Sequence, residues 1–114
     1  MKLISLKDLP TIITSHNVGK KKEIIKNGEI ESLTQFSQVT FMPGEVVKEH
    51  NHEDLYEVYL VEEGEGTLRL NGQKYHIEKG ICFVVEPGEL HEVENTSNGE
   101  LVLTYFVIQK QKRI

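Results

Sequence analysis

The sequence predicts an all-β fold, a sandwich or a barrel, preceded by an N-terminal arm. From Ser32 onward, apolar and polar residues alternate in short runs with a period of two, as in half-buried strands. Turns that contain glycine, such as Asn71-Gly72 and Pro87-Gly88, separate these runs. The chain has 114 residues, the length of one domain, and it shows no long helical periodicity.

The first part of the chain, residues 1–30, is expected to form an arm or strand at the edge of a barrel or in a dimer contact. The barrel itself is expected to span residues 31–114. The charged run Lys20–Lys26 (KKKEIIK) is interpreted as a solvated strand. His16 lies in the arm, and the sequence predicts no partner for it.

The segment Thr67–Ile77 predicts a hairpin whose register can be worked out. Asn71-Gly72 is the favoured residue pair for a two-residue turn that matches the strand twist. This turn places Leu70 opposite Gln73, Leu68 opposite Tyr75, Arg69 opposite Lys74 and Thr67 opposite His76. Leu68, Leu70, Tyr75 and Ile77 are then expected on the core face, while Arg69 and His76 are expected on the surface.

The strand Leu101–Ile108 is apolar at both odd and even positions, and Val58–Val61 is similar. A strand with two apolar faces needs a cover on each face. In a fold of two layers, a second subunit can supply the outer cover, so we expect a homodimer.

Composition and charge restrict the class of protein. The net charge of −5 and the pI of about 5.5 argue against a partner made of nucleic acid, since phosphate contacts favour a basic surface. Cys82 is the single cysteine, which fits a reducing compartment, and we expect a small core residue there rather than a nucleophile. No signal peptide is recognised, and the longest apolar run is too short to span a membrane. We therefore expect a cytoplasmic protein.

Two histidines and a glutamate lie close together in the segment Glu49–Gly64. His50 and His52 share one face of a strand, and a bend at Glu53-Asp54 can return Glu57 to the same side. His91 follows a Pro-Gly turn and is a candidate fourth ligand. Three imidazoles and a carboxylate suit Mn, Fe, Co, Ni or Zn, although a polar strand end is the alternative interpretation.

The spacing of these residues resembles the two sequence boxes of the cupin superfamily, and of its small single-domain members in particular. The first box is represented by Gly44, His50, His52, Glu57 and Gly64, and the second by Gly80, Gly88, His91 and Asn95. The one departure is Glu86 where the family has proline, with Pro87 one place later. The resemblance implies a double-stranded β-helix (jelly-roll) barrel with one divalent metal ion per chain, held by His50, His52, Glu57 and His91. It also supports dimerisation.

The predicted metal site indicates a small molecule that chelates the ion through oxygens. One hypothesis is a metal-dependent enzyme, with a dioxygenase acting on a diketone, enediol or hydroxy acid as the leading version. The alternative is a non-catalytic protein that binds or senses a sugar or small acid, in which the metal holds the ligand or stabilises the barrel.

We expect specific roles for several residues around the predicted ion. Tyr59 is the candidate hydrogen-bond donor to the ligand set, and Phe41 and Phe106 are candidate pocket walls. Cupins that degrade oxalate hold the dianion with an arginine that points into the site. Arg69 is expected to point outward and Arg113 lies at the terminus, so neither is expected to hold oxalate.

Overall fold

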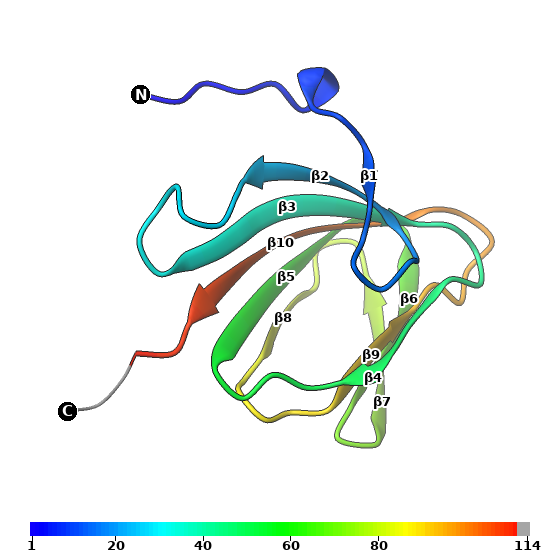
Figure 1. Ribbon diagram of the computed structural model, residues 1–114. Helices are drawn as coiled ribbons and strands as arrows, with labels where there is room; N and C mark the ends of the chain where they lie inside the picture. The colour runs from blue at the N-terminus through cyan, green and yellow to red at the C-terminus, as the bar shows by residue number, and fades with distance from the viewer. Residues whose placement is uncertain (112–114) are drawn as a thin grey trace.

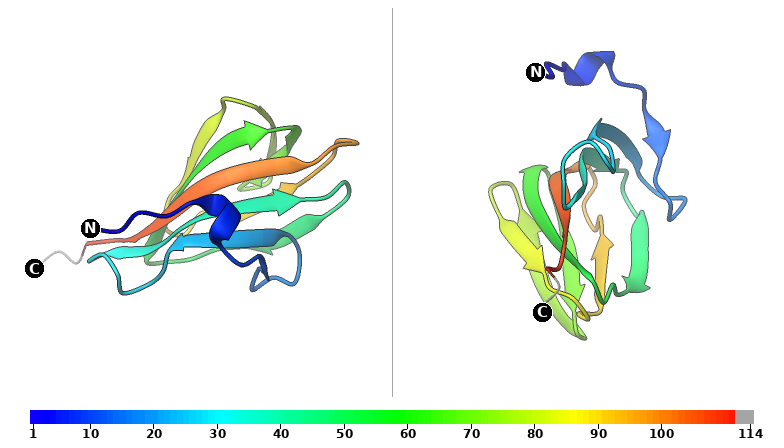
Figure 2. Two further views of the ribbon diagram at one scale, coloured as in Figure 1. Left: turned by 90° about the horizontal axis from the view of Figure 1, so that it is seen from above. Right: turned by 60° about the vertical axis from the view of Figure 1, so that its left-hand side comes forward.

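Two antiparallel sheets face each other in the computed structural model, which describes residues 1–111 (Figures 1 and 2). The last three residues of the expected barrel segment, including Arg113, lie outside the described residues. The larger sheet consists, in order, of β1 (Ile12–Ile13), β2 (Lys20–Ile25), β3 (Leu33–Phe41), β10 (Leu101–Gln109), β5 (Leu55–Glu63) and β8 (Cys82–Val85). The smaller sheet consists of β4 (Val46–His50), β9 (His91–Glu94), β6 (Glu65–Leu70) and β7 (Gln73–Glu78). A 3-10 helix, η1 (Leu6–Asp8), precedes β1, and the predicted all-β class is confirmed.

The core lies between the two sheets and depends on strict alternation along β10. The odd residues Leu101, Leu103, Tyr105 and Val107 are buried, whereas the even residues face away from the core. Side chains from both sheets complete the core: Val39, Phe41, Val47, Val61, Leu68, Ile77 and Val93. Burying one such aliphatic side chain contributes about 1.5–3 kcal/mol to folding.

The predicted hairpin between β6 and β7 is confirmed residue by residue, with Leu70 paired to Gln73 and Leu68 paired to Tyr75. Leu68 and Ile77 are buried as expected. Tyr75 is 46% exposed, so its assignment to the core is wrong. It lies near the end of the hairpin on β7, the edge strand of its sheet, where fewer side chains cover it.

The outer face of the six-stranded sheet carries a continuous apolar row. Strand pairing aligns five side chains across β2, β3, β10, β5 and β8, namely Ile25, Phe36, Phe106, Val58 and Val84. We call these five residues the outer row. Phe106 therefore points away from the pocket, and its predicted role as a pocket wall is wrong. Cys82 is exposed on the edge strand β8, so its assignment to the core is also wrong.

Strand β2 is less solvated than its sequence indicates. It pairs with β3 so that Lys21 lies opposite the buried Val39, and Lys20 lies opposite Thr40. The Lys20 side chain is exposed, as expected, but the Lys21 side chain faces inward and is only 11% exposed. The interpretation as a solvated strand is thus wrong for Lys21.

Among residues 1–111, no helix is long and apolar enough to cross a membrane. The cytoplasmic location remains a prediction.

Candidate functional site

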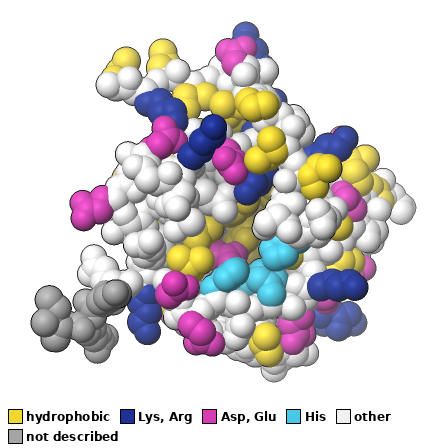
Figure 3. Space-filling model, in the orientation of Figure 1, with side chains coloured by type: hydrophobic (Ala, Val, Ile, Leu, Met, Phe, Trp, Pro, Cys, Tyr) yellow, Lys and Arg dark blue, Asp and Glu magenta, His cyan; other side chains and the backbone are white. Residues whose placement is uncertain are grey.

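A cavity of about 220 Å³ opens between the two sheets. Figure 3 shows histidine side chains at the rim of a hollow that contains an acidic group and apolar side chains. The apolar wall consists of Val39, Phe41, Val47, Leu55, Val93, Leu103 and Val107. The role of Phe41 as a wall residue is therefore confirmed. The volume lies below the usual range of about 300–1,000 Å³ for drug-sized ligands, so the cavity suits a small metabolite.

Three of the four predicted ligands converge in this cavity, and we call them the inner group. Each of His50, Glu57 and His91 offers a ligand atom, and these atoms all lie within 4.8 Å of one another. His50 and His91 pair directly across β4 and β9, while Glu57 comes from β5 of the opposite sheet. An extra residue in β4 between Val47 and His50 shifts the pairing register, which lets both side chains face inward.

The hydrogen bonds of the two histidines direct their lone pairs into the cavity. His50 Nδ1 lies 2.8 Å from the Lys48 carbonyl oxygen, and His91 Nδ1 lies 3.1 Å from that of Glu89. A carbonyl oxygen only accepts, so each Nδ1 carries the proton and each neutral ring keeps its lone pair on Nε2. This is the arrangement in which ligating histidines are oriented by their other nitrogen.

His91 Nε2 is a buried polar atom beside the Glu57 carboxylate that lacks a hydrogen-bond partner among the described residues. The nearest Glu57 oxygen, Oε1, lies 3.6 Å away. A buried polar atom without a partner costs about 1–3 kcal/mol, so a partner that reaches Nε2 from within the cavity would be stabilising.

The fourth predicted ligand, His52, lies just outside the inner group. The expected placement of His52 on the same strand as His50 is wrong, because β4 ends at His50; the bend at Glu53-Asp54 is where it was expected. His52 Nε2 is 3.4 Å from Glu57 Oε1, but its side chain is 40% exposed. The Gly88 amide donates to the His52 carbonyl oxygen at 2.7 Å, which ties this loop to the turn before His91.

The carboxylate of Glu57 is held by its neighbours in the charged form. Burial alone raises its pKa, but the nearby His91 imidazole, the hydrogen bond from Tyr59 and the nearby His52 lower the pKa below its usual value. The Tyr59 hydroxyl donates to Glu57 Oε2 at 2.5 Å. Burial, reinforced by the charge of Glu57, raises the pKa of Tyr59 well above its usual value, so Tyr59 remains a donor.

The two histidines of the inner group differ in their electrostatics. Burial lowers the pKa of His50, which keeps its ring neutral and able to bind a cation. Burial also lowers the pKa of His91, but the Glu57 carboxylate and the Glu89 carbonyl oxygen outweigh that effect and raise the pKa overall. A proton therefore competes for His91 more strongly than for His50.

His16 is a site residue that the sequence did not reveal. Its ring centroid lies 4.6 Å from that of His50, and it lines the cavity. The turn between β1 and β2 presents it: the His16 amide donates to Thr14 Oγ1 at 3.3 Å, and the Asn17 amide donates to the Thr14 carbonyl oxygen at 3.0 Å. His16 lies outside both sequence boxes, so no spacing signal could have identified it.

Two further box residues have structural roles. Asn95 is fully buried, and its Nδ2 donates to the carbonyl oxygens of Phe41 and Gly99, each at 2.8 Å. Gly64 has φ of +83°, and a Cβ there would lie 2.1 Å from the Glu100 carbonyl oxygen. Only glycine fits this close approach.

A second group of possible ligand atoms lies on the outer face of the smaller sheet. It consists of Glu65, His76 and Glu78, and we call it the outer group. Its ligand atoms are as close together as those of the inner group, but all three side chains are more than half exposed.

Comparison with known proteins agrees with this architecture. Residues 37–108 match the Cupin domain family, Cupin_2. Over 74 residues the chain is 36% identical to an oxalate-binding protein of Thermotoga maritima, which covers 64% of this chain and 60% of that protein. Over 88 residues it is 30% identical to the HTH-type transcriptional regulator PuuR of Escherichia coli, and this alignment covers 77% of this chain and 48% of the regulator. The chain thus spans only about half to three-fifths of the length of these relatives.

A solved structure shows the same fold over nearly the whole chain. The crystal structure of a predicted oxalate decarboxylase from Thermotoga maritima has a TM-score of 0.86 and 23% identity, and the match covers 95% of this chain and 99% of that one. Together with the family match, this confirms the jelly-roll barrel that the sequence boxes implied. The chain belongs to the cupin domain family.

Proposed function

We propose that this cupin binds a divalent metal ion through His50, His52, Glu57 and His91 and uses it to hold a small molecule by its oxygens. The observation that carries the proposal is the buried His91 Nε2, which has no hydrogen-bond partner among the described residues and faces the Glu57 carboxylate. A cation between them would satisfy the nitrogen and neutralise the buried charge.

The donor set fits a first-row divalent ion. Imidazole nitrogens with one carboxylate suit Mn, Fe, Co, Ni or Zn, and one ion per chain is expected. The Nδ1 atoms of His50 and His91 are already bonded to main-chain carbonyl oxygens, so both rings are oriented before any ion arrives. His52 could complete the set through a small change in its exposed side chain.

The residues around the group define what the site can do. A bound divalent ion would act as a Lewis acid toward chelating oxygens of the ligand. Tyr59 donates a hydrogen bond to Glu57, and the apolar wall of the cavity offers a contact surface to the carbon atoms of the ligand. A largely apolar cavity with a few convergent polar groups is typical of sites for small molecules. A dioxygenase acting on a diketone, an enediol or a hydroxy acid is the leading enzymatic version of the proposal.

A non-catalytic role in binding or sensing is the second candidate. Its support comes from the relatives, since one is named as an oxalate-binding protein and another as a transcriptional regulator. In this version, the metal holds a small acid or a sugar without turnover, or it stabilises the barrel.

The two candidates are separated by loading the protein with Fe(II), Mn(II) or Ni(II) and measuring oxygen uptake with a panel of diketones, enediols and hydroxy acids. Oxalate binding is measured on the same samples by calorimetry. Oxygen uptake that depends on metal and substrate supports the enzyme. Tight binding without turnover in any metal form supports the binding protein, and the absence of metal binding contradicts both.

We further propose that the chain forms a homodimer through the outer row. The five apolar side chains of the outer row form a strip that a second copy can cover, and Val84 in this row is 48% exposed. Light scattering after size-exclusion chromatography is expected to give a dimer for the wild type and a monomer for Val84→Glu. A wild-type monomer would contradict this proposal without affecting the metal site.

A further inference from the structure

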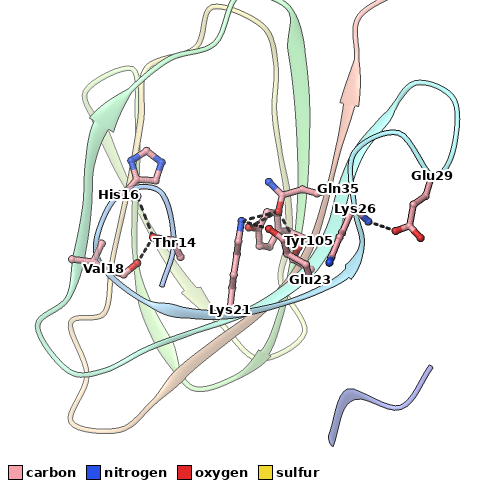
Figure 4. A network of polar contacts seen from close by, with 10 residues as sticks. Thr14, His16, Val18, Lys21, Glu23, Lys26, Glu29, Gln35 and Tyr105 are labelled. Atoms are coloured by element: carbon pink, nitrogen blue, oxygen red, sulfur yellow. Dashed lines mark hydrogen bonds and ion pairs between the residues drawn. The ribbon is translucent and has the colours of Figure 1, made fainter. Parts of the chain in front are cut away.

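Lys21 is an unusual lysine because its side chain is only 11% exposed and lines the cavity of the candidate site. Lysine is rarely buried unless it is paired. Its Nζ donates to Gln35 Oε1 at 3.2 Å and lies 3.5 Å from Glu23 Oε1 (Figure 4). An ammonium group has three N–H donors, and these two contacts use at most two of them.

Two polar side chains of β3 surround the same end of the cavity. Gln35 Oε1 accepts hydrogen bonds from Lys21 Nζ, Ser37 Oγ and Tyr105 OH. Thr34 also lines the cavity, and its buried Oγ1 has no hydrogen-bond partner among the described residues. The region thus combines the Lys21 ammonium group, whose charge Glu23 partly balances at 3.5 Å, with a hydroxyl that has no hydrogen-bond partner among the described residues.

This polar end is connected to the inner group through the tyrosines. The Tyr105 ring stacks on the Tyr59 ring with centroids 4.9 Å apart, and Tyr59 donates to Glu57. His16 lines the same cavity and lies beside His50, with ring centroids 4.6 Å apart. Because the residues of the polar end and of the inner group line the same cavity, one small molecule can contact both.

We propose that Lys21, positioned by Gln35 and acting together with Thr34, binds an anionic group at the far end of a ligand whose other end chelates the metal. The ligand class is a small dicarboxylate-like acid with two adjacent oxygens at one end and a carboxylate at the other. A carboxylate would accept from the remaining Lys21 donor and from Thr34 Oγ1. This inference rests on the proposed function only for the chelating end of the ligand.

The test compares acids that differ only at the far end. α-Ketoglutarate is compared with α-ketovalerate, and α-ketoadipate with α-ketocaproate, in calorimetric titrations of the metal-loaded protein. The wild type is expected to bind at least one diacid about tenfold or more tightly than its monoacid, as a charge-assisted hydrogen bond implies. Lys21→Met is expected to remove this preference while leaving monoacid binding and metal content unchanged.

Lys20→Met is the matched control, because Lys20 is on the same strand and exposed. It is expected to keep the full preference for diacids. Thr34→Val is the second variant, and it tests the same anion site even if Lys21→Met does not fold. Because Thr34 Oγ1 has no partner among the described residues, this change is expected to leave the melting temperature unchanged or raise it, while it lowers the diacid preference several-fold.

A metal-free experiment separates this inference from the proposed function. Glutarate has no chelating end, and its titration into metal-free protein is followed by NMR at the amides of Thr34, Gln35 and Tyr105. We expect shifts at these amides in the wild type and none in Lys21→Met. This result would support the anion site even if no metal bound.

The inference is overturned if monoacids and diacids bind the metal-loaded wild type equally, or if Lys21→Met retains the preference. Monoacid binding without any preference would leave the proposed function intact. Glutarate shifts that persist in Lys21→Met would also contradict the role of Lys21.

Discussion

Two groups of possible ligands can be compared: the inner group of His50, Glu57 and His91, and the outer group of Glu65, His76 and Glu78. In each group the ligand atoms all lie within 4.8 Å of one another. Their surroundings differ. Glu57 and His91 are buried beside an apolar cavity, and His91 Nε2 lacks a partner among the described residues. Glu65, His76 and Glu78 are solvated on the surface, where water can satisfy every polar atom.

The difference shows that closeness of ligand atoms is a weak criterion for a metal site. Solvated carboxylates lose much of the benefit of a bound cation, since water already stabilises their charge. The inner group also has its imidazoles oriented by main-chain carbonyl oxygens, whereas His76 Nε2 lies beside two carboxylates. The following predictions test whether this contrast decides metal binding.

The largest expected effect comes from His91→Ala. Removing the His91 imidazole should lower metal affinity by more than about 100-fold. Loss of a residue that only hydrogen-bonds to a metal ligand typically costs about 10- to 100-fold, and loss of a ligand should cost more. His76→Ala is the matched control and should leave affinity unchanged. Elemental analysis and competition with a chelator measure both. Full metal occupancy in His91→Ala, or loss of metal in His76→Ala, would reverse the comparison.

Glu57→Gln should have the next largest effect. The substitution keeps the shape of the side chain but removes the negative charge that faces the ion, so affinity should fall by at least about tenfold. Glu65→Gln removes a charge from the outer group and should leave metal affinity unchanged. Calorimetric titration with Mn(II) or Zn(II) measures the two variants, and equal losses in both would show that the inner group is not special.

His16→Ala should have a smaller effect that is limited to the ligand. His16 contacts His50 at the side of the cavity but lies outside the inner group. Metal affinity should therefore stay within about threefold of wild type, while binding of a small acid such as oxalate weakens several-fold. A loss of metal comparable to that of His91→Ala would instead make His16 a ligand.

The smallest expected effect concerns how folding stability depends on pH. The sign of this dependence should differ between the metal-free and the metal-loaded protein. The pKa of His91 is raised in the folded protein, so in the metal-free state its contribution to stability is fully present below pH 6.5 and is lost as the pH rises through the raised pKa. In the metal-loaded state a proton competes with the ion, so stability should rise over the same window.

Thermal melts of the wild type and of His91→Ala measure this dependence, and the difference between them isolates His91 from the other titrating groups. Equal slopes for the metal-free and metal-loaded wild type would contradict the assignment of His91 as a ligand.

The sequence predicted the parts of the fold and site that depend on local spacing. The Asn71-Gly72 turn determined the hairpin register, and that register placed His76 on the surface, where the structure has it. The spacing within the two boxes selected four ligands, and three of them, His50, Glu57 and His91, lie together in the cavity. The fourth, His52, lies beside them with a side chain that is 40% exposed.

The sequence could not predict features that depend on contacts between distant segments. His16 and Lys21 reach the cavity because β2 pairs with β3, and nothing in the local pattern of the arm indicates that pairing. Phe106 was misassigned because a strand that is apolar on both faces has no period that distinguishes inside from outside. The extra residue in β4 that turns His50 inward is likewise invisible in the spacing.

The most direct test of the metal site is anomalous scattering from a crystal grown with Mn(II) or Zn(II) and measured at the absorption edge of the ion. We predict one strong peak per chain within coordination distance of His50, Glu57 and His91, with His52 turned toward it. A cavity without a peak, in a crystal where the ion occupies Glu65, His76 and Glu78 instead, would contradict the account.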